Sequence, residues 1–106
     1  MEKLFAYGSL KEEEVQETIF GRILEGVPET LLGYVVKELK IEEEYGIETY
    51  TIISATHKKE DSISGILYDT SLRELQLADT YEGKHYKRIE VLLESNQEAW
   101  VYTATT

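Results

Sequence analysis

The chain has 106 residues with 21 acidic and 11 basic side chains, a formal net charge of −10 and no cysteine. The length suits one domain with its own core, so we expect residues 1–106 to form a single domain. Within this sequence the lack of cysteine excludes disulfides, thiolate nucleophiles and cysteine-based zinc sites, and the acidic charge argues against nucleic acid as a partner.

The first residues contain an apolar run, Leu4 to Tyr7, that is too short for a signal peptide. No other segment reaches the length of a membrane span. We therefore expect a cytoplasmic, soluble protein without a membrane partner, present as a monomer or a homodimer.

The N-terminal segment predicts a strand followed by a helix. Residues 4–7 are mostly apolar and precede a Gly-Ser pair that ends the strand. Ser9 and Glu12 have the spacing of a capping box, which predicts a helix over residues 10–20 that stops at Gly21.

The middle of the chain reads as strands separated by turns. Residues 22–30 are predicted as a loop, and residues 30–41 as a strand that Gly33 bends or bulges. The acidic tract 42–44 is predicted as a solvated turn, and residues 48–55 as a strand rich in Thr, Tyr and Ile.

The second half predicts a helix over residues 72–81, for which Thr70 and Ser71 are N-cap candidates. Further strands are predicted at residues 62–69, 86–93 and 99–104. Five or six short strands with two inserted helices indicate the α+β class. A small closed or half-closed barrel would remove the strand edges from such a set.

The tetrapeptide Tyr7-Gly8-Ser9-Leu10 is the first candidate site. A strand that breaks at Gly8 and leads into a helix leaves backbone N–H groups free to bind a carboxylate or phosphate without any Lys or Arg. The alternative is that the segment is only a turn with an N-cap. Ser9 does not fit a nucleophile elbow.

Glu82, near the end of the second predicted helix, is the second candidate. Asp79 lies three residues earlier, and tyrosines flank Glu82 at positions 81 and 86, so like charge and desolvation would both raise the pKa of Glu82 and suit it to general-base chemistry. The alternative is a solvated Glu82 near Arg88. His57 and His85 lie in polar loops, and too few ligands converge for a metal site, so we expect no metal.

The ordered set of motifs resembles the gamma-glutamylcyclotransferase-like superfamily, in particular its gamma-glutamylamine cyclotransferase and AIG2-like members. The matching segments are Leu4-Phe5-Ala6-Tyr7-Gly8-Ser9-Leu10, Ile63-Ser64-Gly65-Ile66-Leu67-Tyr68, Leu77-Ala78-Asp79-Thr80-Tyr81-Glu82-Gly83, Tyr86-Lys87-Arg88-Ile89-Glu90-Val91 and Trp100-Val101-Tyr102.

The resemblance implies a six-stranded β-barrel flanked by helices, with a pocket at one end. Residues 7–10 would bind the glutamyl group, with Tyr86 as a further substrate-binding residue, and Glu82 would accept and donate the proton. The reaction would convert a γ-glutamyl amine or a related compound into 5-oxoproline and a free amine, without metal or cofactor.

The chain departs from the family pattern where family members carry a Tyr-Pro pair, because residues 45–50 contain no proline, and residues 21–44 match only loosely. The resemblance therefore does not specify the leaving amine. Two alternatives to an enzyme stay open: a non-catalytic module that binds a small acidic metabolite in the same pocket, and an interaction protein with a vestigial pocket.

Overall fold

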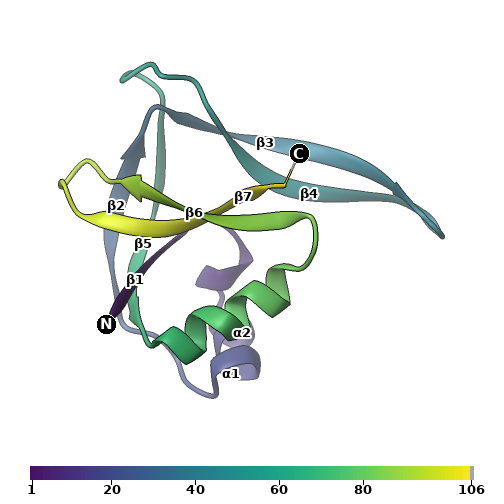
Figure 1. Cartoon of the computed structure of the whole chain (residues 1–106), viewed down its shortest axis with the longest axis horizontal. Coiled ribbons are helices and arrows are strands. Elements are labelled where there is room, and N and C mark those ends of the chain that lie inside the picture. The colour runs from purple at the N-terminus through teal and green to yellow at the C-terminus, as the bar shows by residue number, and fades with distance from the viewer. Residues whose placement is uncertain (106) are drawn as a thin grey trace.

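The computed structural model describes residues 1–105, which form two α-helices, one short 3₁₀ helix and seven strands (Figure 1). In chain order the elements are β1 (Glu2–Ala6), η1 (Ser9–Lys11), α1 (Glu13–Phe20), β2 (Gly26–Leu32), β3 (Tyr34–Glu43), β4 (Gly46–Ala55), β5 (Ser62–Thr70), α2 (Leu72–Glu82), β6 (Tyr86–Leu92) and β7 (Glu98–Ala104). Neither α1 nor α2 is long and apolar enough to cross a membrane, and the same holds for η1.

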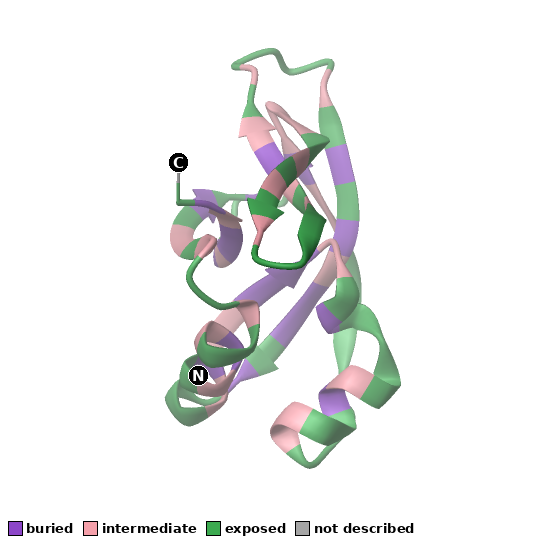
Figure 2. Cartoon of the chain, turned by 90° about the vertical axis from the view of Figure 1, so that its right-hand side faces the viewer, coloured by how far each residue is buried: buried purple, intermediate pink, exposed green. Residues whose placement is uncertain are grey.

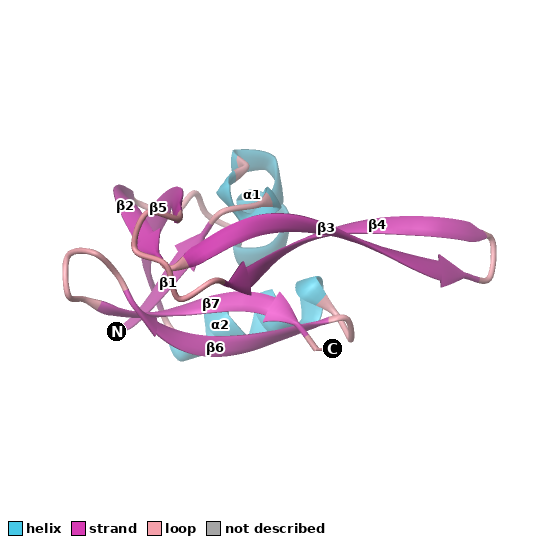
Figure 3. Ribbon diagram, turned by 90° about the horizontal axis from the view of Figure 1, so that it is seen from above, coloured by secondary structure: helices cyan, strands magenta, loops and turns pink. Residues whose placement is uncertain are grey.

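The strands form two sheets. Five of them pair in the order β2-β5-β1-β7-β6, with β1 and β7 parallel and the other neighbours antiparallel. Within residues 1–105, β3 and β4 pair only with each other, as a long hairpin that reaches well beyond the rest of the molecule (Figure 3). The expected α+β class is confirmed.

The expected six-stranded barrel is wrong in strand number and in closure. Gly33 has a φ of 84° and separates β2 from β3, so that one predicted strand becomes two. The edge of β4 meets β6 and β7 through side chains: the hydroxyls of Tyr86 and Thr103 donate to the carbonyls of Thr51 (2.8 Å) and Ile53 (3.1 Å). Among the described residues no backbone ladder joins β4 to β6 or to β7, so the strands do not close into a barrel.

The predicted loop at residues 22–30 is also corrected, because β2 pairs with β5 along its whole length from Gly26 to Leu32. This pairing outweighs the turn signals of Gly26 and Pro28, and Pro28 is tolerated because β2 is an edge strand. The expected turn at residues 42–44 begins later, since β3 continues to Glu43.

The two predicted helix starts have different outcomes. Of the two N-cap candidates, Ser71 caps α2, and the structure adds a capping box with Glu74 that was not predicted. Ser9 makes no such cap: its hydroxyl lies 2.8 Å from that of Tyr81, and α1 begins at Glu13 after the separate turn η1. The stop at Gly21 is confirmed by its left-handed φ of 74°.

Two apolar clusters cover the two faces of the five-stranded sheet, as expected from the alternation of side chains along a strand. Phe5 and Val101 belong to the cluster that also includes Ile53 of the hairpin. Leu4 and Tyr102 belong to the cluster that packs against the helices through Leu75 and other residues. Figure 2 shows the buried residues concentrated along the strands, with much of both helices open to solvent.

Candidate active site

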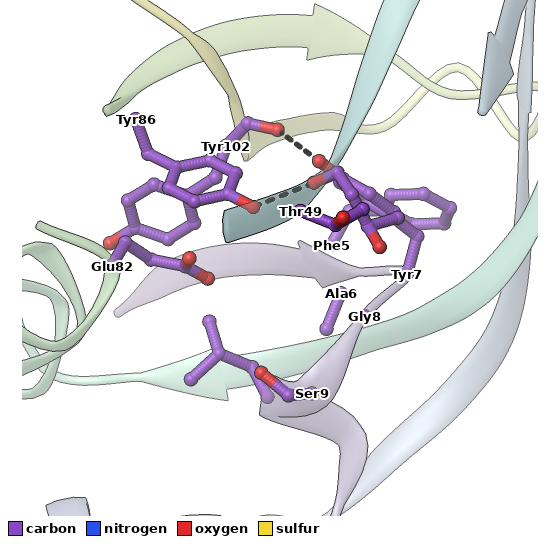
Figure 4. A pocket seen from close by; sticks show the side chains of 11 residues that line it. Phe5, Ala6, Tyr7, Gly8, Ser9, Thr49, Glu82, Tyr86 and Tyr102 are labelled. Carbon is purple, nitrogen blue, oxygen red and sulfur yellow. Dashed lines mark hydrogen bonds between the residues drawn. The ribbon is translucent and has the colours of Figure 1, made fainter. Parts of the chain in front are cut away.

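A cavity of about 240 Å³ opens where β1 and η1, the middle of β4, the end of α2, the start of β6, and β7 come together (Figure 4). Its lining includes all six residues that the sequence and the family resemblance propose for catalysis or substrate binding, namely Tyr7, Gly8, Ser9, Leu10, Glu82 and Tyr86. The complete lining is Phe5, Ala6, Tyr7, Gly8, Ser9, Leu10, Thr49, Thr51, Glu82, Tyr86 and Tyr102. The volume is below the usual range for drug-sized ligands, so it suits a molecule of about amino-acid size.

Unpaired backbone donors lie on one wall of the cavity. The turn η1 closes with a hydrogen bond from the N–H of Lys11 to the carbonyl of Gly8 (3.1 Å). Among the described residues the N–H groups of Ser9 and Leu10 have no acceptor, as is usual at the start of a helical turn. The buried Gln16 holds this turn in place by donating to the carbonyl of Leu10 (2.8 Å).

The carboxyl group of Glu82 points into the cavity from the last residue of α2 (Figure 4). Gly83 ends the helix there with a φ of 82°. Burial raises the pKa of Glu82 to about 7. A carboxyl group with this pKa exchanges a proton readily at neutral pH, which is the property that general acid–base catalysis requires.

Asp79 does not raise the pKa of Glu82, contrary to the prediction from their spacing. Asp79 receives two hydrogen bonds from Arg88 (2.8 and 3.0 Å) and one from the hydroxyl of Tyr102 (2.7 Å). The bond from Arg88 is the main reason why the pKa of Asp79 is lowered. Arg88 thus serves Asp79 as counter-charge and leaves the Glu82 carboxyl without a cationic partner among the described residues.

The tyrosines of the cavity act as neutral donors to the protein itself. The hydroxyl of Tyr7 donates to the carbonyl of Tyr102 (2.8 Å), and that of Tyr86 donates to the carbonyl of Thr51 (2.8 Å) (Figure 4). Burial is the main cause that raises the pKa of both Tyr7 and Tyr86, and the nearby Glu82 adds to it. Both phenols therefore stay protonated and stiffen the cavity wall.

Sequence reasoning missed five lining residues: Phe5, Ala6, Thr49, Thr51 and Tyr102. A signal for the two threonines was present. The period of two places Thr49 and Thr51 on the same face of β4 as Ile53. The structure shows that Ile53 is buried on this face, whereas the two threonines are exposed and line the cavity. No pattern in the sequence tells that this face meets Glu82, because the contact depends on how the hairpin is placed.

A metal site is not supported by the side chains of residues 1–105, in which no three His, Cys, Asp or Glu residues converge. His85 instead lies with its Nε2 atom 3.1 Å from a carboxylate oxygen of Glu43. The cavity has Glu82 as its only ionisable carboxyl and no Lys or Arg in its lining. An anionic ligand there would depend on backbone and hydroxyl donors.

The family model described as "Gamma-glutamyl cyclotransferase, AIG2-like" matches residues 4–106. A search of curated proteins returns no match. Two solution structures of Arabidopsis thaliana proteins are similar, with identities of 25% and 28% and TM-scores of 0.76 and 0.69; they match 99% and 97% of this chain and 69% and 60% of their own.

A structure titled "Gamma-glutamyl cyclotransferase" has a TM-score of 0.74 at 18% identity, over 99% of this chain and 67% of its own. At that identity the likeness concerns the fold alone. The chain thus spans about two thirds of the length of these three structures.

Proposed function

We propose, since this chain belongs to the gamma-glutamyl cyclotransferase, AIG2-like family, that it cyclises a γ-glutamyl amine or a related γ-glutamyl compound to 5-oxoproline and a free amine. Glu82 is the general acid and base of this reaction. Tyr7, Gly8, Ser9, Leu10 and Tyr86 form the substrate-binding wall.

In the proposed reaction the α-amino nitrogen of the substrate attacks its own γ-carbonyl carbon. A carbon–nitrogen bond forms and closes a five-membered ring, and the bond from the same carbon to the leaving nitrogen breaks. The Glu82 carboxylate takes a proton from the attacking nitrogen and returns it to the leaving nitrogen, so that the carboxylate is regenerated. No other reactant is consumed.

The single observation that carries the proposal is the placement of Glu82, with its pKa of about 7, in the same small cavity as the unpaired amides of Ser9 and Leu10. Free amides suit the carboxylate of a glutamyl group. Holding that carboxylate fixes the substrate beside the proton carrier, and such positioning turns a cyclisation into a favourable intramolecular step.

The test is to incubate the protein with a set of γ-glutamyl amines and to quantify the products by chromatography. Cyclisation predicts 5-oxoproline and free amine in equal amounts. Release of glutamate instead of 5-oxoproline would identify a hydrolase. If 5-oxoproline binds but no substrate in the set is converted, the cavity is a metabolite-binding site and the catalytic proposal fails.

A further inference from the structure

The hairpin of β3 and β4 supplies one wall of the cavity although it belongs to a separate sheet. Thr49 and Thr51 line the cavity from β4. Figure 4 shows Glu82 on the opposite side of the cavity from Thr49, whereas the hydroxyl of Tyr86 reaches β4 and donates to the carbonyl of Thr51. The rest of the hairpin extends away from the five-stranded sheet (Figure 3). The shape of the cavity on this side therefore depends on where the hairpin is held.

Besides the hydrogen bonds from Tyr86 and Thr103 to β4, a cluster of three side chains helps to fix the part of the hairpin that lines the cavity. Tyr50 lies between the two threonines and points to the opposite face of the strand. Its hydroxyl donates to Glu43 (2.9 Å), and its ring centroid lies 4.8 Å from that of His85 and 6.0 Å from that of Tyr86. Nε2 of His85 lies 3.1 Å from the same Glu43 oxygen, which connects the hairpin to the residue before β6.

The wall formed by β4 is the one available to contact the part of the substrate that the other walls do not bind. In the proposed reaction the amides of η1 hold the carboxylate of the glutamyl group, and Glu82 must reach both nitrogens at the γ-carbonyl. Phe5, Ala6 and Tyr102 come from the two adjacent central strands and close the floor. The substituent on the leaving nitrogen then lies against β4.

We infer that the β3–β4 hairpin selects the leaving amine, and that Glu43, Tyr50 and His85 are positioning residues that hold Thr49 and Thr51 in place for this selection. The inference rests on the proposed function, because it assigns one wall of the same cavity to one half of the proposed substrate. It adds the specificity element that the loose family match over residues 21–44 leaves open.

The test uses two variants. Tyr50→Phe removes only the hydroxyl that donates a hydrogen bond to Glu43, and Glu43→Gln removes the negative charge of the acceptor. Glu42→Gln is the matched control: it makes the same change one residue away, on the other face of β3, where the side chain is exposed and forms no hydrogen bond within residues 1–105. For each variant, kcat/KM is measured with γ-glutamyl methylamide and γ-glutamyl benzylamide, and the Kd of 5-oxoproline is measured by calorimetry. Amide hydrogen exchange along β4 reports whether the loss of contacts in the Glu43, Tyr50 and His85 cluster makes this strand more mobile.

We expect Tyr50→Phe and Glu43→Gln to change the ratio of kcat/KM between the two amides by about tenfold or more, the lower end of the discrimination that a pocket achieves for a small apolar difference. The Kd of 5-oxoproline, which has no leaving group, stays within about twofold, and β4 amides exchange faster. Glu42→Gln leaves all three quantities unchanged. A ratio that stays constant overturns the inference. A changed ratio that is accompanied by weaker binding of 5-oxoproline overturns it as well.

Failure of the proposed reaction is separable from failure of this inference. If the wild-type protein converts neither amide, the Kd values of the intact amides replace kcat/KM, and the same ratio is compared. A changed ratio then supports the hairpin as a specificity element of a binding site. Absence of binding by both amides and by 5-oxoproline overturns the function and the inference together.

Discussion

The partly buried carboxyl group of Glu82 makes the protein less stable at high pH. Its pKa is raised from 4.5 to about 7, so the folded protein binds this proton more tightly than the unfolded chain does. The free energy of unfolding therefore falls as the pH rises through this window and stays lower above it. Allowing for partial exposure to solvent, the loss is about 2 kcal/mol.

Glu82→Gln has no such titration, so urea unfolding at about pH 4 and about pH 8 should show the variant gaining stability relative to the wild type as the pH rises. Asp79→Asn is the control with the opposite sign and needs a further urea series below about pH 4. The pKa of Asp79 is lowered, so its contribution is present above the usual range of an aspartate and is lost as the pH falls below it. Parallel pH profiles for the wild type and Glu82→Gln would contradict the burial of Glu82.

At the residue scale the sequence indicated the candidate side chains but not which of them pair. Asp79, Glu82 and Arg88 lie close in the chain, and their spacing allows either carboxylate to pair with Arg88. The structure pairs Arg88 with Asp79 because β6 runs beside α2 and because the Trp100 ring lies 4.4 Å from the guanidinium. That choice depends on packing between elements, which no local spacing contains.

At the scale of elements, Gly65 allows β1 and β5 to approach closely beside the cavity. A Cβ atom at this position would lie 2.5 Å from the carbonyl oxygen of Ala6 and 2.6 Å from the ring of Phe5. Gly65→Ala should therefore lower the free energy of unfolding by about 1–3 kcal/mol, since the backbone of β1 must move.

Gly8→Ala is the matched control in the same urea experiment, because a Cβ at Gly8 meets nothing within 4 Å and its φ of −122° is accessible to alanine. We expect a change of about 0.5 kcal/mol or less for Gly8→Ala. Equal losses for the two variants would mean that Gly65 matters for backbone entropy and not for the approach of the strands.

Elements whose ends carry local capping or stop residues were predicted well. Elements that form only by pairing with a strand distant in the sequence were not. The N-cap candidate Ser71 and the apolar spacing of residues 72–81 predicted α2 locally, and the structure confirms the cap and the helix over Leu72–Glu82. The strand β2 carries turn residues and forms because β5 pairs with it along its length. Ser9 shows the reverse case, since its capping pattern is present but its hydroxyl contacts Tyr81 instead.

For the whole molecule, the α+β class followed from the number and arrangement of strands and helices and the family from the order of the motifs, whereas the expected barrel closure was wrong. Closure would need a backbone ladder from β4 to its neighbours, and side-chain hydroxyls of Tyr86 and Thr103 occupy two of the β4 carbonyls instead. The position of the hairpin, and with it the contribution of Thr49 and Thr51 to the cavity, is a property of this tertiary contact.

The central claim is that Glu82 carries the proton in a cyclisation, and the rate of 5-oxoproline release by Glu82→Gln tests it most directly. Glutamine keeps the size of the side chain but cannot accept a proton, so we expect the rate to fall by about 10²-fold or more, while 5-oxoproline binds as tightly as before or more tightly. Asp79→Asn, which changes a carboxylate one turn away, should lose less. A Glu82→Gln variant that releases 5-oxoproline at the wild-type rate would contradict the account.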